Sequence, residues 1–108
     1  IVDGYGLRVA NVFHAGDGNM HPLILFNAND PEEAAKAEAA GNDILRLCVD
    51  AGGCLTGEHG VGIEKRDLMR HQYADVDLAQ MMSVRSAFDP GWILNPSKVF
   101  PLDGRNAT

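Results

Sequence analysis

The chain has 108 residues, of which 45% are apolar and 22% charged, a composition that fits one small globular domain and excludes a disordered tail. Nine basic against fifteen acidic side chains give a net charge of −6, so we expect no nucleic-acid partner and no attraction to an anionic membrane surface. The longest strictly apolar run, residues 23–26, is far shorter than the ~20 residues that a membrane span requires.

The first half of the chain predicts a hairpin followed by a helix. Two apolar, β-branched segments, residues 7–14 and 20–26, flank a glycine-bearing loop, which is typical of a β-hairpin. A helix is predicted from Pro31 to about Ala51, because Asp30 is a typical N-cap and glycines follow at 52–53. With a short third strand expected at 54–56, the sequence predicts an α+β fold in which a small antiparallel sheet packs on helices.

The second half predicts two shorter helices and an irregular tail. Residues 64–71 fit a short helix, and Asp75 is expected to cap another that ends at Asp89. Four residues are expected on the inward face of that second helix: Val76, Ala79, Met82 and Phe88. The tail, residues 91–101, contains too many glycines and prolines for a regular element, and we expect it to pack in an extended form.

The cysteines and the isolated basic residues favour structural interpretations. Cys48 and Cys54 match no common zinc spacing, so we expect two reduced core residues in a reducing compartment, the cytoplasm. Four other side chains are expected at the solvated surface: Lys36, Arg46, Arg66 and His71.

Three of the four histidines lie in two loop-edge clusters. A tight hairpin brings His14 and His21 to the same end of the sheet. Glu58 and His59 lie in a glycine-rich loop after the expected third strand. If that strand pairs beside the hairpin, two imidazoles and a carboxylate converge, which is the composition of an open catalytic metal site. The alternative is that these are ordinary loop or core histidines.

Asp17 and Asn19, between the two hairpin histidines, have two interpretations. A Gly-Asp-Gly-Asn turn uses such side chains for its own hydrogen bonds. The same side chains can instead support the histidines from behind, as partners of metal ligands do.

Three ordered motifs resemble the C-terminal domain of the FAD-linked oxidases. They are His-Ala-Gly-Asp-Gly-Asn-Met-His-Pro at 14–22, Gly-Glu-His-Gly-Val-Gly at 57–62 with Lys65, and the Asp-Pro-Gly-Trp-Ile-Leu-Asn-Pro-Ser-Lys-Val-Phe segment at 89–100. This family includes the FAD subunit of glycolate oxidase, D-lactate dehydrogenases and D-2-hydroxyglutarate dehydrogenase. The resemblance implies the later part of a cap domain of the vanillyl-alcohol-oxidase type, with residues 1–108 as a single partial domain and the N-terminal FAD-binding domain absent.

The resemblance also implies roles for individual residues. In relatives that use a metal, the pattern makes His14, His21 and Glu58 ligands of a divalent ion, zinc or manganese. It makes His59 the general base. If His59 were a ligand instead, Glu58 or Asp17 would be left as the base.

The tail and the glycines bear on the flavin. Asn95 and Lys98 are candidates to meet the edge of the flavin, where Lys98 would stabilise negative charge on its reduced form; a solvated lysine is the alternative. The glycines do not follow the strand-to-helix pattern of a dinucleotide-binding loop. We therefore expect this chain alone to be inactive.

The implied activity is hydride transfer from C2 of a small 2-hydroxy acid to FAD. Leu23 stands where relatives that oxidise hydroxy-dicarboxylates carry Asn, which favours glycolate or D-lactate; Ser97 stands where the family usually has Gly. Implied partners are the protein's own FAD-binding domain and an iron–sulfur electron-acceptor subunit. Two alternatives stay open: a metal-binding or dimerisation module without catalysis, and a metal-dependent hydrolase, in which the tail motif has no role.

Overall fold

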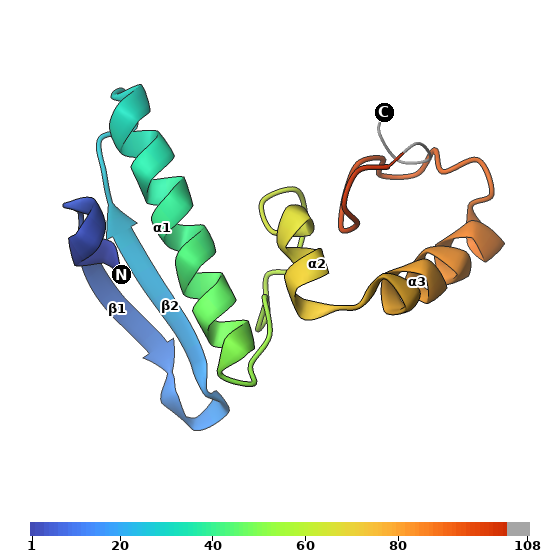
Figure 1. Ribbon diagram of the computed structural model, residues 1–108, viewed down its shortest axis with the longest axis horizontal. Coiled ribbons are helices and arrows are strands. Elements are labelled where there is room, and N and C mark those ends of the chain that lie inside the picture. Colours follow the sequence, from blue (N-terminus) through green and yellow to red (C-terminus); the bar gives the residue numbers. More distant parts are fainter. Residues whose placement is uncertain (104–108) are drawn as a thin grey trace. The chain divides into compact units, whose positions relative to one another are not determined.

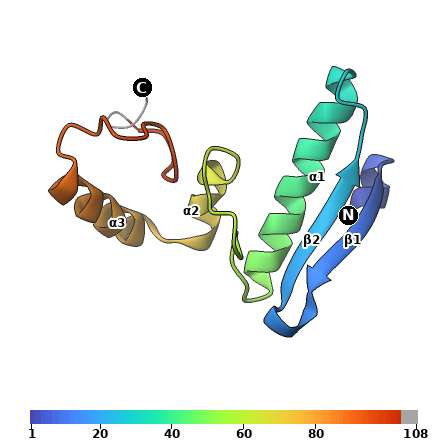
Figure 2. The same cartoon turned by 180° about the vertical axis from the view of Figure 1, so that it is seen from behind.

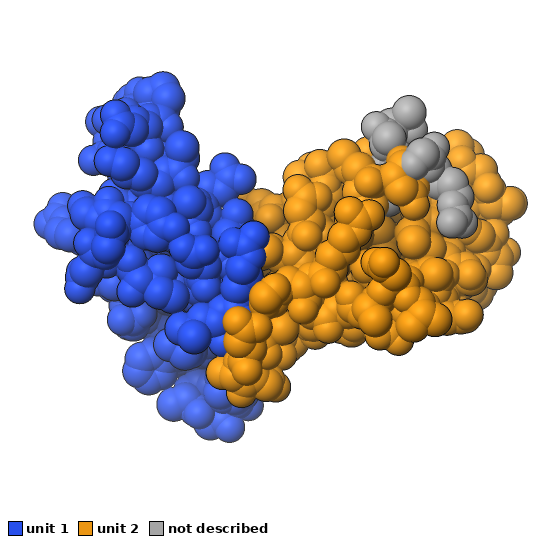
Figure 3. Space-filling view, in the orientation of Figure 1, with its two compact units in different colours: residues 1–47 blue, residues 48–108 orange. Residues whose placement is uncertain are grey.

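The computed structural model describes residues 1–103. Its elements, in chain order (Figure 1), are the 3₁₀ helix η1 (Val2–Tyr5), β1 (Arg8–His14), η2 (Ala15–Asp17), β2 (Asn19–Leu25), α1 (Pro31–Asp50), η3 (Arg66–Leu68), α2 (Met69–Gln72) and α3 (Asp75–Phe88). The chain forms two compact units, residues 1–47 and the remainder from Cys48 onward (Figure 3). Among the described residues, no helix is both long and apolar enough to cross a membrane.

The predicted hairpin is confirmed. β1 and β2 pair in antiparallel register from Arg8 opposite Leu25 to His14 opposite Asn19. The turn between them is η2 followed by Gly18, whose φ of 66° lies in the left-handed region that favours glycine. The strands begin and end within one residue of the predicted positions.

The two faces of the hairpin differ in what covers them. Ile24 packs against the core formed by Val2, Leu7 and Ala37, and in both ribbon views α1 lies alongside β2 (Figures 1 and 2). Residues opposite one another in the register share a face, so the other face carries His14 and His21 together with a row of apolar side chains: Ala10, Val12, Leu23 and Leu25. The last three of these are about half exposed, at 55%, 50% and 48%.

α1 begins and ends as predicted. The Asp30 carboxylate accepts the N–H of Glu32 at 3.0 Å, as an N-cap does. At the other end, Gly52 adopts a φ of 92° and the N–H of Gly53 donates to the Cys48 carbonyl at 2.8 Å, which closes the helix.

The third strand predicted at 54–56 is wrong: within residues 1–103 the sheet has two strands. Side chains bond the backbone groups that a strand would use. The N–H of Leu55 donates to the Gln72 side-chain oxygen at 2.9 Å, and the Cys54 thiol donates to the Thr56 carbonyl at 3.1 Å. Leu55 is 2% exposed and is bonded to Gln72 of α2, so it is buried without joining a sheet.

The helices of the second unit differ from prediction in detail. The helix expected over 64–71 is instead η3 followed by α2. α3 has the predicted span, but the carboxylate that accepts the Ala74 N–H at its start belongs to Asp77 and not to Asp75. Its buried apolar residue is Leu78, at 3% exposure, whereas Val76 and Phe88 are 66% and 86% exposed. Ala79 is also exposed, and only Met82 of the four expected inward residues is even half-buried.

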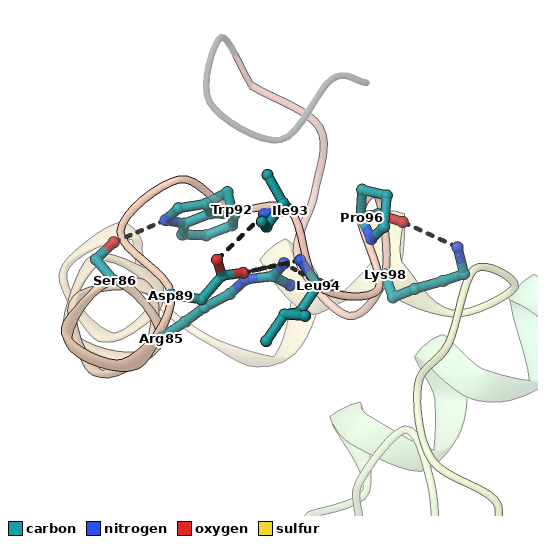
Figure 4. A network of polar contacts seen from close by, with 8 residues as sticks. All are labelled: Arg85, Ser86, Asp89, Trp92, Ile93, Leu94, Pro96 and Lys98. Atoms are coloured by element: carbon teal, nitrogen blue, oxygen red, sulfur yellow. Dashed lines mark hydrogen bonds and ion pairs between the residues drawn. The ribbon is translucent and has the colours of Figure 1, made fainter.

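The polar side of α3 holds the tail (Figure 4). Asp89, 8% exposed, accepts the N–H groups of Ile93 and Leu94 at 3.2 and 3.0 Å. These bonds, that of Leu94 first, and the nearby Arg85 hold the pKa of Asp89 below its usual value. The Arg85 guanidinium also stacks 4.5 Å from the centre of the Trp92 ring. The predicted inward face of α3 rested on the spacing of apolar residues alone, and that spacing gives no signal for these polar contacts.

The expected extended tail is wrong as well. Four residues other than glycine have positive φ in this segment: Trp92 at 52°, Asn95 at 47°, Ser97 at 65° and Val99 at 71°. The tail therefore bends repeatedly, through conformations that side chains with a Cβ atom seldom adopt.

Candidate active site

The two hairpin histidines lie together. The rings of His14 and His21 meet edge to face, with centroids 5.1 Å apart and an interplanar angle of 84°. His14 pairs with Asn19 in the register and His21 with Val12, which places both imidazoles on one face at the turn end of the sheet. His14 is exposed and His21 is half-buried. The pair therefore offers two nitrogen ligands side by side at the surface of the first unit.

Asp17 and Asn19 lie in the turn between those histidines. Asp17 is the last residue of η2 and is exposed, and Asn19 is half-buried directly opposite His14. Their placement fits either a role in the turn or support of the imidazoles.

Glu58 and His59 lie in the second unit, on an exposed loop. The N–H of Gly60 donates to the Thr56 hydroxyl at 2.8 Å. This bond spans Glu58 and His59 and so holds the backbone on both sides of them. Gly60 itself has a φ of 88°. Thr56 was not singled out from the sequence, and the only local signal was a threonine four residues before a glycine.

A hollow of about 340 Å³ borders His59 and is lined by residues 59–65. Its size is at the lower end of small-molecule sites. The loop that carries His59 therefore borders a hollow that is open to solvent.

The tail docks on the end of this loop and on the segment that follows it. Val99 donates its N–H to the Gly62 carbonyl at 2.8 Å, and the Arg66 guanidinium donates to the Ser97 carbonyl at 2.6 Å. The Arg66 side chain is only 17% exposed, so the expectation that it is solvated is wrong. The Lys98 ammonium donates to the Pro96 carbonyl at 2.9 Å (Figure 4).

The remaining surface expectations are mostly confirmed. Lys36 and Arg46 are about half exposed and form ion pairs within α1, with Glu32 and Asp43, and His71 is an exposed residue that contacts Asp50 at 2.8 Å. Both cysteines are free thiols, as expected. The core placement is wrong for Cys54, which is exposed, and Cys48 is only half-buried.

Comparison with known proteins gives the family. Residues 1–99 match the model of the FAD linked oxidases, C-terminal domain. The chain belongs to this family. The α+β fold of a two-stranded antiparallel sheet with helices is consistent with a cap domain of this type.

Named relatives narrow the comparison. The chain is 57% identical over 97 residues to the glycolate oxidase subunit GlcD of Escherichia coli K12, covering 90% of this chain and 19% of that protein. It is 42% identical over 98 residues to the mitochondrial D-lactate dehydrogenase [cytochrome] of Kluyveromyces lactis, covering 91% of this chain and 16% of that protein. GlcD of Bacillus subtilis is 36% identical over 101 residues, 94% of this chain and 22% of that protein. The chain thus spans about a fifth of the length of these relatives.

Proposed function

We propose that this chain is the C-terminal, substrate-covering part of a longer FAD-dependent oxidoreductase that oxidises glycolate or D-lactate. The observation that carries the proposal is the 57% identity, over 90% of the chain, to a protein named as a glycolate oxidase subunit. The exposed Leu23, an apolar residue two positions beyond His21, favours a monocarboxylate over a second substrate carboxylate.

The FAD is held mainly by an N-terminal domain outside this chain. The chain by itself therefore does not catalyse the reaction. Within residues 1–103 no glycine-rich loop leads from a strand into a helix, as a dinucleotide phosphate site requires. The proposal gives this chain a smaller role, in which Asn95 and Lys98 of the tail meet one edge of the flavin. FAD supplies the acceptor for the hydride that leaves C2 of the substrate.

His14, His21 and Glu58 are the proposed ligands of a divalent ion, zinc or manganese. Two imidazoles and one carboxylate are the donor set of an open catalytic site. Two imidazoles bound to one tetrahedral ion have ring centres roughly 5 Å apart, and those of His14 and His21 are 5.1 Å apart. Such an ion acts as a Lewis acid toward the hydroxyl and carboxylate of a 2-hydroxy acid.

His59 accepts the proton of the substrate hydroxyl while the hydride leaves C2, so that a 2-hydroxy acid becomes a 2-oxo acid. An imidazole suits this task at physiological pH, and the hollow beside His59 offers room for a small acid. Asp17 and Asn19 orient the histidine ligands from the turn.

The test is anaerobic mixing of the full-length protein with glycolate, D-lactate, L-lactate and D-2-hydroxyglutarate in turn, followed by the loss of flavin absorbance. Glycolate or D-lactate is expected to reduce the flavin fastest. A protein without flavin, or one reduced best by D-2-hydroxyglutarate, contradicts the proposal. Metal analysis of the same preparation tests separately whether the protein holds a divalent ion.

The proposal includes a cytoplasmic location and an iron–sulfur subunit as electron acceptor. The free thiols of Cys48 and Cys54 are compatible with a reducing compartment. Co-purification of an iron–sulfur protein with the full-length enzyme tests the partner.

A further inference from the structure

The end of the tail has no regular structure to hold its shape. The Arg85 and Asp89 contacts reach as far as Leu94. Beyond it, Asn95, Ser97 and Val99 have positive φ, which costs free energy for residues with a Cβ atom. Contacts from outside the tail must therefore maintain this conformation.

Arg66 and Gly62 provide two such contacts. The Arg66 bond to the Ser97 carbonyl is 2.6 Å long and charge-assisted, and the Val99 bond to the Gly62 carbonyl is 2.8 Å long. These two bonds fall on either side of Lys98. Gly62 is the last glycine of the loop that carries His59, so a backbone hydrogen bond joins the tail directly to this loop.

A gain in folding free energy does not by itself explain why the Arg66 side chain is mostly covered. The Arg66 side chain is 17% exposed, and its buried Nε has no hydrogen-bond partner among the described residues, although it lies 3.7 Å from the carboxylate of the exposed Asp67. A buried polar group without a partner costs free energy that an apolar side chain would avoid. The guanidinium is suited to the bond with the Ser97 carbonyl. It is permanently charged and planar, so the direction of its N–H groups is defined once the side chain is placed.

We infer that Arg66 is a positioning residue: it holds Ser97–Val99 against the glycine loop and so sets where Lys98 stands relative to the flavin. The inference rests on the proposed function, in which Lys98 meets the edge of the flavin, and on the role expected for Lys98 there, the stabilisation of negative charge on the reduced flavin. Arg66 acts through Lys98 and touches neither substrate nor flavin itself.

The experiment compares the flavin midpoint potential of the full-length protein with that of Arg66→Met, Lys98→Met and the double variant. Arg66→Met is expected to make the potential more negative, in the same direction as Lys98→Met. In the double variant the shift is expected not to exceed that of Lys98→Met alone, because one residue acts through the other. Flavin reduction by the preferred hydroxy acid is expected to slow by roughly 10- to 100-fold in Arg66→Met, as for a misplaced active-site group.

Hydrogen exchange gives a readout independent of the flavin. The Val99 amide is expected to exchange faster in Arg66→Met, and Arg66→Lys is expected to be intermediate in exchange and in potential. Arg46→Met is the matched control, since Arg46 is an exposed arginine of α1, and it should resemble the wild type. If Arg66→Met does not fold, Arg66→Lys is judged by the same criteria.

Unchanged potential and exchange in the folded variant, or additive shifts in the double variant, overturn the inference even if the melting temperature falls. A wild-type protein that binds no flavin, or is reduced by no 2-hydroxy acid, overturns the proposed function and this inference with it. The two failures are distinguishable because the second is visible before any variant is made.

Discussion

The phenol of Tyr5 donates a hydrogen bond to the carboxylate of Asp43, 38 residues further along the chain. The bond joins η1, before the sheet, to the middle of α1. Tyr5 also packs on the core of Val2, Leu7 and Ala37, as does Ile44 beside Asp43. One side-chain pair thus ties together the start and the end of the first unit.

Alkaline titration tests this pair. The bond to Asp43 raises the pKa of Tyr5 above its ordinary value of 10.0. Because the folded-state pKa is the higher one, the stabilisation is fully present below pH ~10 and is lost as the pH rises through the folded-state value. Absorbance titration should therefore show one late-ionising phenol, which Tyr5→Phe removes and Asp43→Asn shifts to lower pH. No shift in Asp43→Asn contradicts the assignment.

His59→Asn tests the proposed base. We expect the full-length variant to keep its metal and flavin and to lose roughly 10²-fold or more of its rate, the usual effect of removing a general base. His71→Asn is the control, because His71 is an exposed histidine of the same unit, bonded to Asp50. Stoichiometric metal loss in His59→Asn would instead make His59 a ligand.

Thr56→Val tests how the loop that carries Glu58 is held. Valine keeps the shape of threonine but cannot accept the Gly60 N–H. We expect faster exchange of the Gly60 amide and metal affinity lowered by about 10- to 100-fold, as for loss of a group that supports a ligand. Thr56→Ser keeps the hydroxyl and should restore both values; equal values in the two variants contradict the role.

Gly53→Ala and Gly41→Ala form a stability test with opposite signs. A Cβ atom at Gly53 would lie 2.8 Å from the Cys48 carbonyl oxygen, so we expect about 1–3 kcal/mol of destabilisation. A Cβ atom at Gly41, inside α1, meets nothing within 4 Å, so we expect about 0.5–1 kcal/mol of stabilisation. Urea unfolding of the domain measures both, and two changes of the same sign count against the closure of α1 described above.

Ser97→Gly tests the conformation of the tail. At a φ of 65° glycine is free of the Cβ penalty, and the net gain is expected to be ~0.5–1 kcal/mol after its greater entropy loss. The Ser97 carbonyl still accepts from Arg66, so the flavin potential should not move. Ser83→Gly, on the exposed side of α3, should destabilise by up to about 1 kcal/mol.

Local rules were sufficient for the parts of the fold that local contacts determine. Asp30, Pro31 and Gly52 act within a few residues of where they stand, and α1 ends within one residue of its predicted limit. The contact between His14 and His21 follows from the hairpin register alone. The candidate pair was therefore accessible from sequence, whereas its proposed role required a resemblance.

Two of the errors arose where a side chain bonds a distant backbone group. Gln72 is 17 residues from Leu55, and Arg66 is 31 residues from Ser97. Neither bond has a periodic signature, and each changes how its segment folds. Gln72 takes the N–H that a third strand would have used, and Arg66 becomes mostly covered, at 17% side-chain exposure, although its sequence context is that of a solvated helix.

The hairpin face that carries His14 and His21 affects how the isolated domain behaves in solution. Val12, Leu23 and Leu25 are about half exposed beside the histidines, and within residues 1–103 each of the two strands has one edge without a neighbouring strand. Apolar side chains next to open strand edges favour edge-to-edge association between molecules. We therefore expect the isolated chain to aggregate at high concentration during purification. Lysine substitutions at Val12 or Leu23 should suppress this aggregation.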